Sequence, residues 1–152
     1  MVKIGVDDAF GNWLAGFIDG EGCFSMFKVK SAFCCEFNIC LRDDDSEIIE
    51  EIAQRLGFGK AIYRLPGATT LDAKSQVVFR VRKKAECLAL VHFLDRYPLR
   101  AKKLKDYIIW KNAVLLMNET KGGHRFRGPN LERNMALEVL KSDLHGVKEY
   151  VN

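Results

Sequence analysis

The apolar positions in the N-terminal part of the chain follow first a helical and then an extended pattern. Residues 9–20 form a largely apolar stretch of helical character. Asp7 or Asp8 can begin this helix, because a side-chain oxygen at an N-cap accepts an otherwise unpaired backbone N–H. Apolar and polar residues then alternate with a period of two, which is typical of a half-buried strand. We therefore expect a helix over 9–20 and a hairpin of two strands over 23–30 and 33–42.

The same two patterns recur in the rest of the chain. An acidic run at 43–47 opens a second helix, 45–56, because carboxylates stabilise the unpaired N–H groups at a helix N-terminus, and Gly57 follows its end. Two strands come next, near 60–66 and 75–83. Helices are then expected over 85–95, 100–118 and 131–145, with a basic loop at 119–130 between the last two.

One segment of the first helix combines a bare strip with a carboxylate at its end. Residues 13–22 read Trp-Leu-Ala-Gly-Phe-Ile-Asp-Gly-Glu-Gly. Gly16 and Gly20 are four residues apart, so they share a helix face where another backbone can approach closely. Glu21 follows at the helix exit, where unpaired carbonyls and the helix dipole favour a cation. This pattern is typical of a packing interface with a metal site at its end, while the alternative is a buried helix that merely contains two glycines.

The order Leu-Ala-Gly-Phe-Ile-Asp-Gly-Glu-Gly at 14–22 resembles the signature motif of the LAGLIDADG homing endonucleases. The predicted order of elements is also similar to the core of that family. The resemblance implies an α+β fold with an αββαββα core and an antiparallel DNA-binding sheet. We assign residues 1–118 to this endonuclease core, and residues 119–152 to a C-terminal loop and helix that extend the same domain.

Because the chain carries one copy of the motif, the resemblance implies a homodimer. The two motif helices would cross at a two-fold axis, which brings the two Glu21 carboxylates together, one for each DNA strand. Mg²⁺ prefers carboxylate, carbonyl and water oxygens, and Glu21 with the Gly20 carbonyl offers the first two. Mn²⁺ is an alternative, and Ca²⁺ would occupy a non-cleaving form. Asp19 is expected to hydrogen-bond unpaired backbone at the crossed helix ends. The expected interface residues are Leu14, Gly16, Phe17, Ile18 and Gly20.

The family also places a lysine near the active site, and residues 97–103, Tyr-Pro-Leu-Arg-Ala-Lys-Lys, match that segment. Lys102 and Lys103 are both catalytic candidates, because spacing alone can slip by one position. A lysine there can polarise the attacking water or offset phosphate charge, whereas a solvated basic turn is the plainer interpretation. A polar residue at the end of the second strand usually completes the pocket. The alignment gives Leu41 there, with Arg42 one position away.

The polar faces of the predicted strands are suited to DNA. In this family the sheet lies in the major groove, where side chains read base edges; without the motif, an ordinary solvent-facing sheet would explain the same polarity. A strand of about eight residues at ~3.3 Å each spans roughly eight base pairs, so a dimer would read a pseudo-palindrome of roughly sixteen to twenty base pairs. The base-reading candidates are Glu36, Asn38, Cys40, Arg42, Arg64, Gln76, Arg80 and Arg82, and the flanking phosphate contacts are expected from Lys121, His124, Arg125 and Arg127.

The composition indicates the number of domains and the cellular compartment, but it says little about function. At 152 residues the chain is about one domain, and its net charge of +4 is modest. No apolar run approaches the length of a membrane span and no signal-peptide pattern opens the chain, so no membrane partner is expected. The 5 cysteines are odd in number and lack paired spacing, which argues against disulfides and a zinc site. We expect reduced thiols and an intracellular location, in an organelle or a prokaryotic cytoplasm.

The leading hypothesis is a site-specific double-strand DNA endonuclease encoded within a mobile intron. Its partners would be double-stranded DNA and a second copy of the chain, with no small-molecule substrate. One alternative is a LAGLIDADG-fold binding protein without cleavage, such as an intron RNA maturase or a transcription factor; another is an unrelated structural domain. Glu21 and the downstream lysines favour the nuclease, since a pure binder has no need of a carboxylate facing phosphates. The aromatic residues Trp13, Tyr107 and Trp110 are expected in the core.

Overall fold

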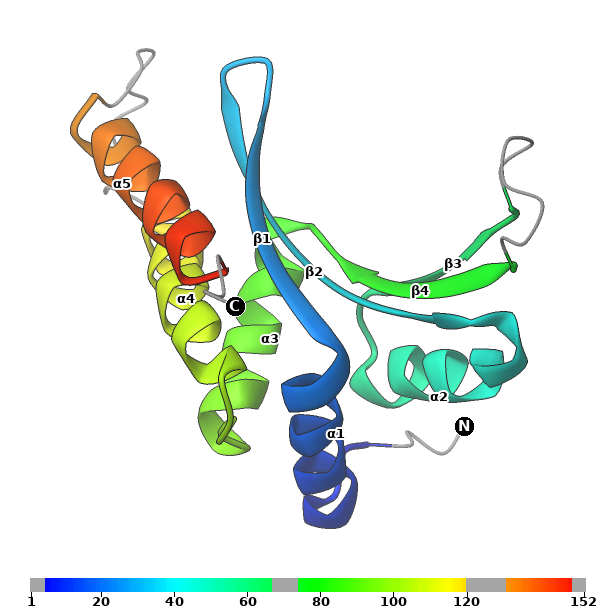
Figure 1. The fold of residues 1–152 in the computed structure, drawn as a ribbon. Coiled ribbons are helices and arrows are strands. Elements are labelled where there is room, and N and C mark those ends of the chain that lie inside the picture. The colour runs from blue at the N-terminus through cyan, green and yellow to red at the C-terminus, as the bar shows by residue number, and fades with distance from the viewer. Residues whose placement is uncertain (1–4, 67–73, 120–130, 149–152) are drawn as a thin grey trace.

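The computed structural model describes residues 5–66, 74–119 and 131–148. Within them the chain forms five α-helices and one four-stranded sheet (Figure 1). The α+β class and the order of the elements are those expected from the sequence. The elements are α1 (Asp8–Glu21), β1 (Gly22–Val29), β2 (Ala32–Arg42), a short 3-10 turn (Asp43–Asp45), α2 (Ser46–Leu56), β3 (Lys60–Arg64), β4 (Gln76–Val81), α3 (Lys84–Arg96), α4 (Lys103–Asn118) and α5 (Leu131–Lys148).

The sheet is antiparallel throughout, with the strand order β1-β2-β4-β3. In Figure 1 helices α1 to α4 gather on one side of the curved sheet, and α5 packs on α4 and along β1. The other side, which we call the open face, is uncovered by helices. By strand alternation and register its residues are Cys23, Ser25, Phe27, Val29, Ala32, Cys34, Glu36, Asn38, Cys40, Arg42, Lys60, Ile62, Arg64, Gln76, Val78 and Arg80.

The core lies between the helices and the covered face of the sheet. Phe37 of β2 and Phe79 of β4 are 0% and 1% exposed, and their ring centroids lie 6.4 Å apart. Tyr107 and Trp110 of α4 are buried in the same cluster, as the sequence predicted. Trp13, in contrast, is 43% exposed, so its prediction as a core residue is wrong. Its helix is apolar on two sides, and Trp13 lies on the side that stays partly exposed to solvent.

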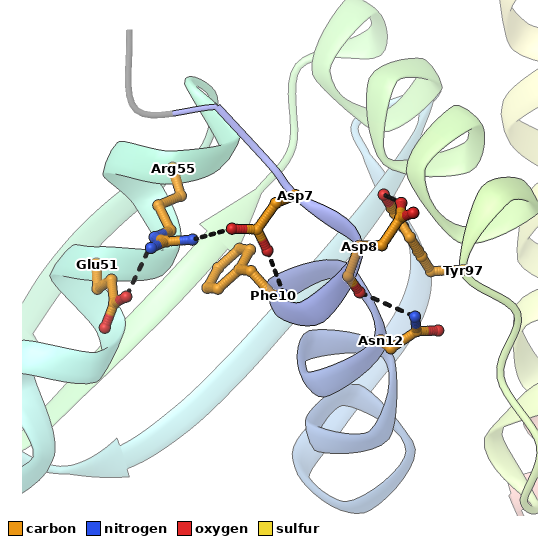
Figure 2. Close-up of polar contacts among 7 residues, drawn as sticks. All are labelled: Asp7, Asp8, Phe10, Asn12, Glu51, Arg55 and Tyr97. Carbon is orange, nitrogen blue, oxygen red and sulfur yellow. Dashed lines mark hydrogen bonds and ion pairs between the residues drawn. The ribbon is translucent and has the colours of Figure 1, made fainter. Parts of the chain in front are cut away.

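Two neighbouring aspartates anchor the start of α1 (Figure 2). Asp7 caps the helix, and its Oδ1 accepts a hydrogen bond from the backbone N–H of Phe10 at 2.8 Å. Asp8 Oδ1 accepts a hydrogen bond from the Tyr97 hydroxyl at 2.8 Å, which ties α1 to the end of α3. This hydrogen bond and the charge of Arg96 hold the pKa of Asp8 below its ordinary value. The N-terminal end of α1 is therefore fixed against α3.

At its other end α1 passes into β1 without an intervening loop. Gly22 ends the helix, donating its backbone N–H to the Ile18 carbonyl, and is also the first residue of the strand. A Cβ atom at Gly22 would lie 2.8 Å from the Ile18 carbonyl oxygen and 2.9 Å from Phe37 Cε2. A side chain at this position would therefore force the helix and the sheet apart. Glycine at the junction lets Glu21 lie immediately before the first residue of the sheet.

Candidate nucleic-acid interface and cleavage site

Glu21 is exposed at the C-terminal end of α1, where this helix meets β1. Gly20 beside it is also exposed, and a Cβ atom there would meet nothing within 4 Å. Within the described residues no group of three or more His, Cys, Asp or Glu is arranged to hold a metal ion. Glu21 and the Gly20 carbonyl fit part of a site for a hard divalent cation, which takes oxygen ligands and keeps several waters.

Asp19 has the structural role that the sequence predicted, but with different partners. Its Oδ2 accepts from the backbone N–H of Arg100 at 2.8 Å and its Oδ1 from that of Ala101 at 3.1 Å. These two donors belong to the connection between α3 and α4, and not to crossed helix ends as expected. Asp19 therefore fixes the start of α4 against the end of α1.

This attachment brings one of the two candidate lysines to the end of α1. Lys103 is the first residue of α4, and its Nζ donates to the Gly22 carbonyl oxygen at 2.6 Å. Gly22 directly follows Glu21, so the Lys103 ammonium lies at the junction of α1 and β1. Lys102 precedes the helix and is exposed. Leu41 packs against the core, whereas Arg42 lies on the open face, so Arg42 is the better placed of the two second-strand candidates.

The strand register arranges the polar candidates of the open face in rows across the sheet. One row crosses all four strands and includes Asn38 and Arg80. Another row consists of Arg42, Gln76 and Arg64. Adjacent strands lie about 4.8 Å apart, so each row presents donors at regular intervals. In full, the first row is Cys23, Asn38, Arg80 and Lys60, of which Cys23 and Lys60 were not singled out from the sequence.

Two of the base-reading candidates, Arg82 and Glu36, form an ion pair with each other. Arg82, one residue beyond β4, donates from Nε to Glu36 Oε2 at 2.8 Å, and its guanidinium lies over the Phe27 ring. Asn38 Nδ2 also donates to Glu36 at 3.3 Å. Between the polar rows lies an apolar one, in which Val78 is 1% exposed. In the same row Cys40 is exposed and Ile62 is half-buried, so this row places less polar residues between the two polar rows of the open face.

Part of the predicted dimer interface is wrong. Leu14 and Ile18 are 0% and 1% exposed within a single chain, because they pack into the core of their own domain. Gly16 is exposed with open space at its Cβ position, as is Gly20. Phe17 is half-buried. The surface that remains is a strip, here called the α1 strip, that consists of Trp13, Gly16, Phe17 and Gly20.

The α1 strip has a preformed aromatic end. The rings of Trp13 and Phe17 stack with centroids 5.2 Å apart and an interplanar angle of 14°. Beside Trp13 is a hollow of about 390 Å³ between α1 and α2. Figure 2 shows Arg55 at this hollow, between Glu51 and Asp7, and its guanidinium lies 4.6 Å from the centroid of the Phe10 ring. The apolar end of the α1 strip thus lies next to a hollow lined by charged side chains.

The structure does not test the predicted phosphate contacts. The phosphate-contact candidates Lys121, His124, Arg125 and Arg127 lie outside the described residues. In the part of the chain that the structure describes, no helix combines the length and the hydropathy needed to cross a membrane.

The two buried thiols, Cys35 and Cys87, are kept protonated by burial, which raises the pKa of each to about 12. They are packing residues of the core.

Comparison with known proteins gives a consistent result. A profile of the LAGLIDADG endonuclease family matches residues 14–114, which is more than half of the chain. The probable intron-encoded endonuclease Cox1-I1b of Schizosaccharomyces pombe is 27% identical over 147 residues, which are 93% of this chain and 35% of that protein. An uncharacterised 50.9 kDa protein in ND4 intron 1 of Podospora anserina is 30% identical over 112 residues, which are 69% of this chain and 24% of that protein. The chain thus spans about a third or less of the length of these two relatives.

Solved structures share the fold. The LAGLIDADG meganuclease I-AabMI, bound to uncleaved DNA, has a TM-score of 0.68 at 29% identity, over 86% of this chain and 43% of that chain. The archaeal intron-encoded homing endonuclease I-Vdi141I, complexed with DNA, has a TM-score of 0.73 at 21% identity, over 95% of this chain and 87% of that chain. The second likeness concerns the fold alone. Together with the profile match and the motif at the end of α1, these likenesses lead to one conclusion: the chain belongs to the LAGLIDADG endonuclease family.

Proposed function

We propose that this chain is an intron-encoded, site-specific double-strand DNA endonuclease that hydrolyses phosphodiester bonds at Glu21. The observation that carries the proposal is the junction of α1, β1 and α4, where an exposed carboxylate and the Lys103 ammonium lie at the same end of the sheet. Family membership and the DNA-bound state of the similar I-AabMI support it. Cleavage of target DNA in Mg²⁺, lost when the ion is chelated, is the experiment that tests the proposal.

Each residue of the junction has a distinct task in this proposal. Glu21 and the Gly20 carbonyl would hold a divalent cation, with Mg²⁺ or Mn²⁺ supporting cleavage and Ca²⁺ supporting binding alone. Such an ion, when bound, lowers the pKa of water and offsets charge on the phosphate. The Lys103 ammonium would add positive charge next to the phosphate, besides that of the metal ion. Because the Gly22 carbonyl already holds this ammonium in place, it would not have to move during the reaction. Asp19 keeps the start of α4 in register with Glu21.

The open face would place the DNA over this junction. A four-stranded antiparallel sheet fits the major groove as a curved surface, and the row that contains Asn38 and Arg80 leads from β3 to the start of β1. That row therefore joins the base-reading region to the cleavage centre.

We also propose a reducing, intracellular setting, because the free thiols of Cys23, Cys34 and Cys40 lie on this side of the sheet.

We expect Arg80→Ala to change base preference more than general affinity. Arg80 lies in the middle of the polar row, on a rigid strand, where an arginine can bond guanine with two hydrogen bonds; such a contact is worth about 1–3 kcal/mol. Binding to a randomised-site library should show relaxed preference at one symmetric pair of positions. Arg96→Ala, at the exposed end of α3 and off the open face, is the control and should leave base preference unchanged. An equal loss of affinity for all sequences in Arg80→Ala would contradict the placement of the sheet in the groove.

We further propose that two copies of the chain associate through the α1 strip. Gly16 and Gly20 leave space for a second helix, and the Trp13–Phe17 stack offers apolar surface at one end. A two-fold axis at this strip would bring two Glu21 residues together, each serving one DNA strand. The homodimer therefore explains why one chain carries only part of a metal site among its described residues.

Gly16→Leu is expected to separate the two copies without harming the single domain. Nothing lies within 4 Å of a Cβ atom at Gly16, and leucine favours a helix over glycine by about 1 kcal/mol, so the monomer should be at least as stable. Sedimentation should show a dimer for the unmutated protein and a monomer for the variant. Gly146→Leu, with equally open space on α5, is the control and should remain dimeric. A monomeric unmutated protein would refute the homodimer.

A further inference from the structure

The cleavage junction contains a buried charge that the proposed function has not used. Asp106, in the first turn of α4, is 2% exposed and is the sole buried charged residue in the described ranges. Burying a carboxylate is costly unless opposite charge compensates it. Burial raises the pKa of Asp106, and the ammonium groups of Lys148 and Lys103 act in the opposite direction. The positive charges of these two lysines therefore offset part of the cost of burying Asp106.

The two lysines bind carbonyl groups of the same edge strand. Lys103 Nζ donates to the Gly22 carbonyl at 2.6 Å, and Lys148 Nζ donates to the Phe24 carbonyl. Gly22 and Phe24 are two residues apart on β1, so their carbonyls point to the same side, about 7 Å from each other. Lys148, the last residue of α5, thus lies next to Lys103 although 45 positions separate them in the chain.

The three charges depend on one another. Two ammonium groups at neighbouring carbonyls repel, and the buried carboxylate of Asp106 offsets that repulsion. If Asp106 were neutral, this repulsion would be uncompensated, and if Lys148 were absent, the attraction of the carboxylate would act on Lys103 alone. We infer that Asp106 and Lys148 are positioning residues that hold the Lys103 ammonium beside Glu21, so that α5 is part of the cleavage machinery. This inference rests on the proposed function of Lys103.

The attachment of α5 to β1 supplies a matched control. Along β1, α5 is anchored at a second point, where Lys28 forms an ion pair with Glu138. Lys28 pairs with Phe33 next to the turn of the β1–β2 hairpin, whereas Gly22 and Phe24 lie at the end of β1 that follows α1. In Figure 1 the C-terminal end of α5 lies toward α1. Glu138→Gln therefore loosens the docking of α5 without changing the charges at the junction. A purely structural role of Lys148 would make the two anchors equivalent.

Single-turnover cleavage at saturating protein separates the two roles. Asp106→Asn and Lys148→Met are each expected to slow cleavage about tenfold while changing affinity for uncleaved DNA less than about threefold. Lys148→Arg should restore the rate to within about threefold, because it keeps the charge, and Glu138→Gln should stay within about twofold of the parent. In the Lys103→Met background, Lys148→Met should add little, since residues that act through one group are not additive. Equal slowing by Glu138→Gln and Lys148→Met would overturn the inference.

A second measurement needs no cleavage. Acetylation of lysines in the intact protein, mapped by mass spectrometry, reports how freely the Lys103 amine leaves its site, with exposed Lys105 as the internal reference. Labelling of Lys103 should rise by roughly fivefold in Asp106→Asn and Lys148→Met and stay unchanged in Glu138→Gln. Unchanged labelling in both variants would overturn the positioning role. A protein that shows the labelling change but never cleaves DNA would support the positioning role and overturn the proposed function instead.

Discussion

Glu21→Gln is expected to lower the single-turnover cleavage rate by at least about 10³-fold while leaving affinity for the uncleaved target unchanged or slightly higher. Glutamine keeps the size of the side chain but loses the charge that binds a divalent cation. Because Glu21 is exposed at the end of α1, the substitution removes no packing, and one negative charge fewer near phosphates favours binding. Quenched-flow cleavage in Mg²⁺ and binding in Ca²⁺ would measure the two quantities separately.

The control for this variant is Glu47→Gln, which removes an exposed carboxylate from the first turn of α2, away from the junction. It should cleave at the parental rate, and both variants should unfold at a similar temperature. Cleavage by Glu21→Gln within tenfold of the parent would contradict the role of Glu21 as a metal ligand.

The second large effect is expected at Lys103. Lys103→Met should slow cleavage by about 10²-fold, the cost of removing one preorganised charge donor from an active site. The reason is its contact with the Gly22 carbonyl, which holds the ammonium next to Glu21. Lys102→Met, one residue earlier and outside α4, should slow cleavage less than about fivefold. Single-turnover rates of the two variants decide between the lysines, and a larger loss for Lys102→Met would contradict the assignment of Lys103.

The alternation of apolar residues predicted the strands well, for a physical reason. In β2 one face must pack on helices and the other must not, so Phe37 and Ile39 alternate with Asn38 and Cys40, and the structure confirms this parity. β3 is short and lacks a clear alternation, so the place of Lys60 on the open face became visible only from its pairing with Arg80 of β4.

The first helix shows where pattern alone is insufficient. It is apolar on two sides, and periodicity does not say which side meets the core of its own domain. Leu14 and Ile18 turned out to face inward, while Trp13 faces outward. Gly16 did indicate the outer face of the helix, because a helix face without side chains contributes no packing to the core of its own domain, and the space at its Cβ position is open. Gly16, Gly20 and Phe17 of the strip were thus predictable from the sequence, whereas Trp13 was not.

The junction beside Glu21 contains the contacts that sequence could predict least. Asp106 and Lys148 approach Lys103 through contacts between α4, α5 and β1, and a lysine bound to a backbone carbonyl leaves no side-chain pattern. The choice between Lys102 and Lys103 stayed open for the same reason. Local spacing predicts that a lysine precedes or begins α4, and only the packing of α4 against β1 shows which one reaches Gly22.

The most direct test of the central claim is selection from a plasmid library with random inserts, incubated in Mg²⁺ with the unmutated protein and with Glu21→Gln in parallel. The proposed function predicts that the unmutated protein linearises plasmids that share one pseudo-palindromic sequence of roughly sixteen to twenty base pairs, and that Glu21→Gln binds the same plasmids without cutting them. Plasmids bound by both proteins and linearised by neither would contradict the claim, and would assign the chain to the LAGLIDADG-fold proteins that bind nucleic acid without cleavage.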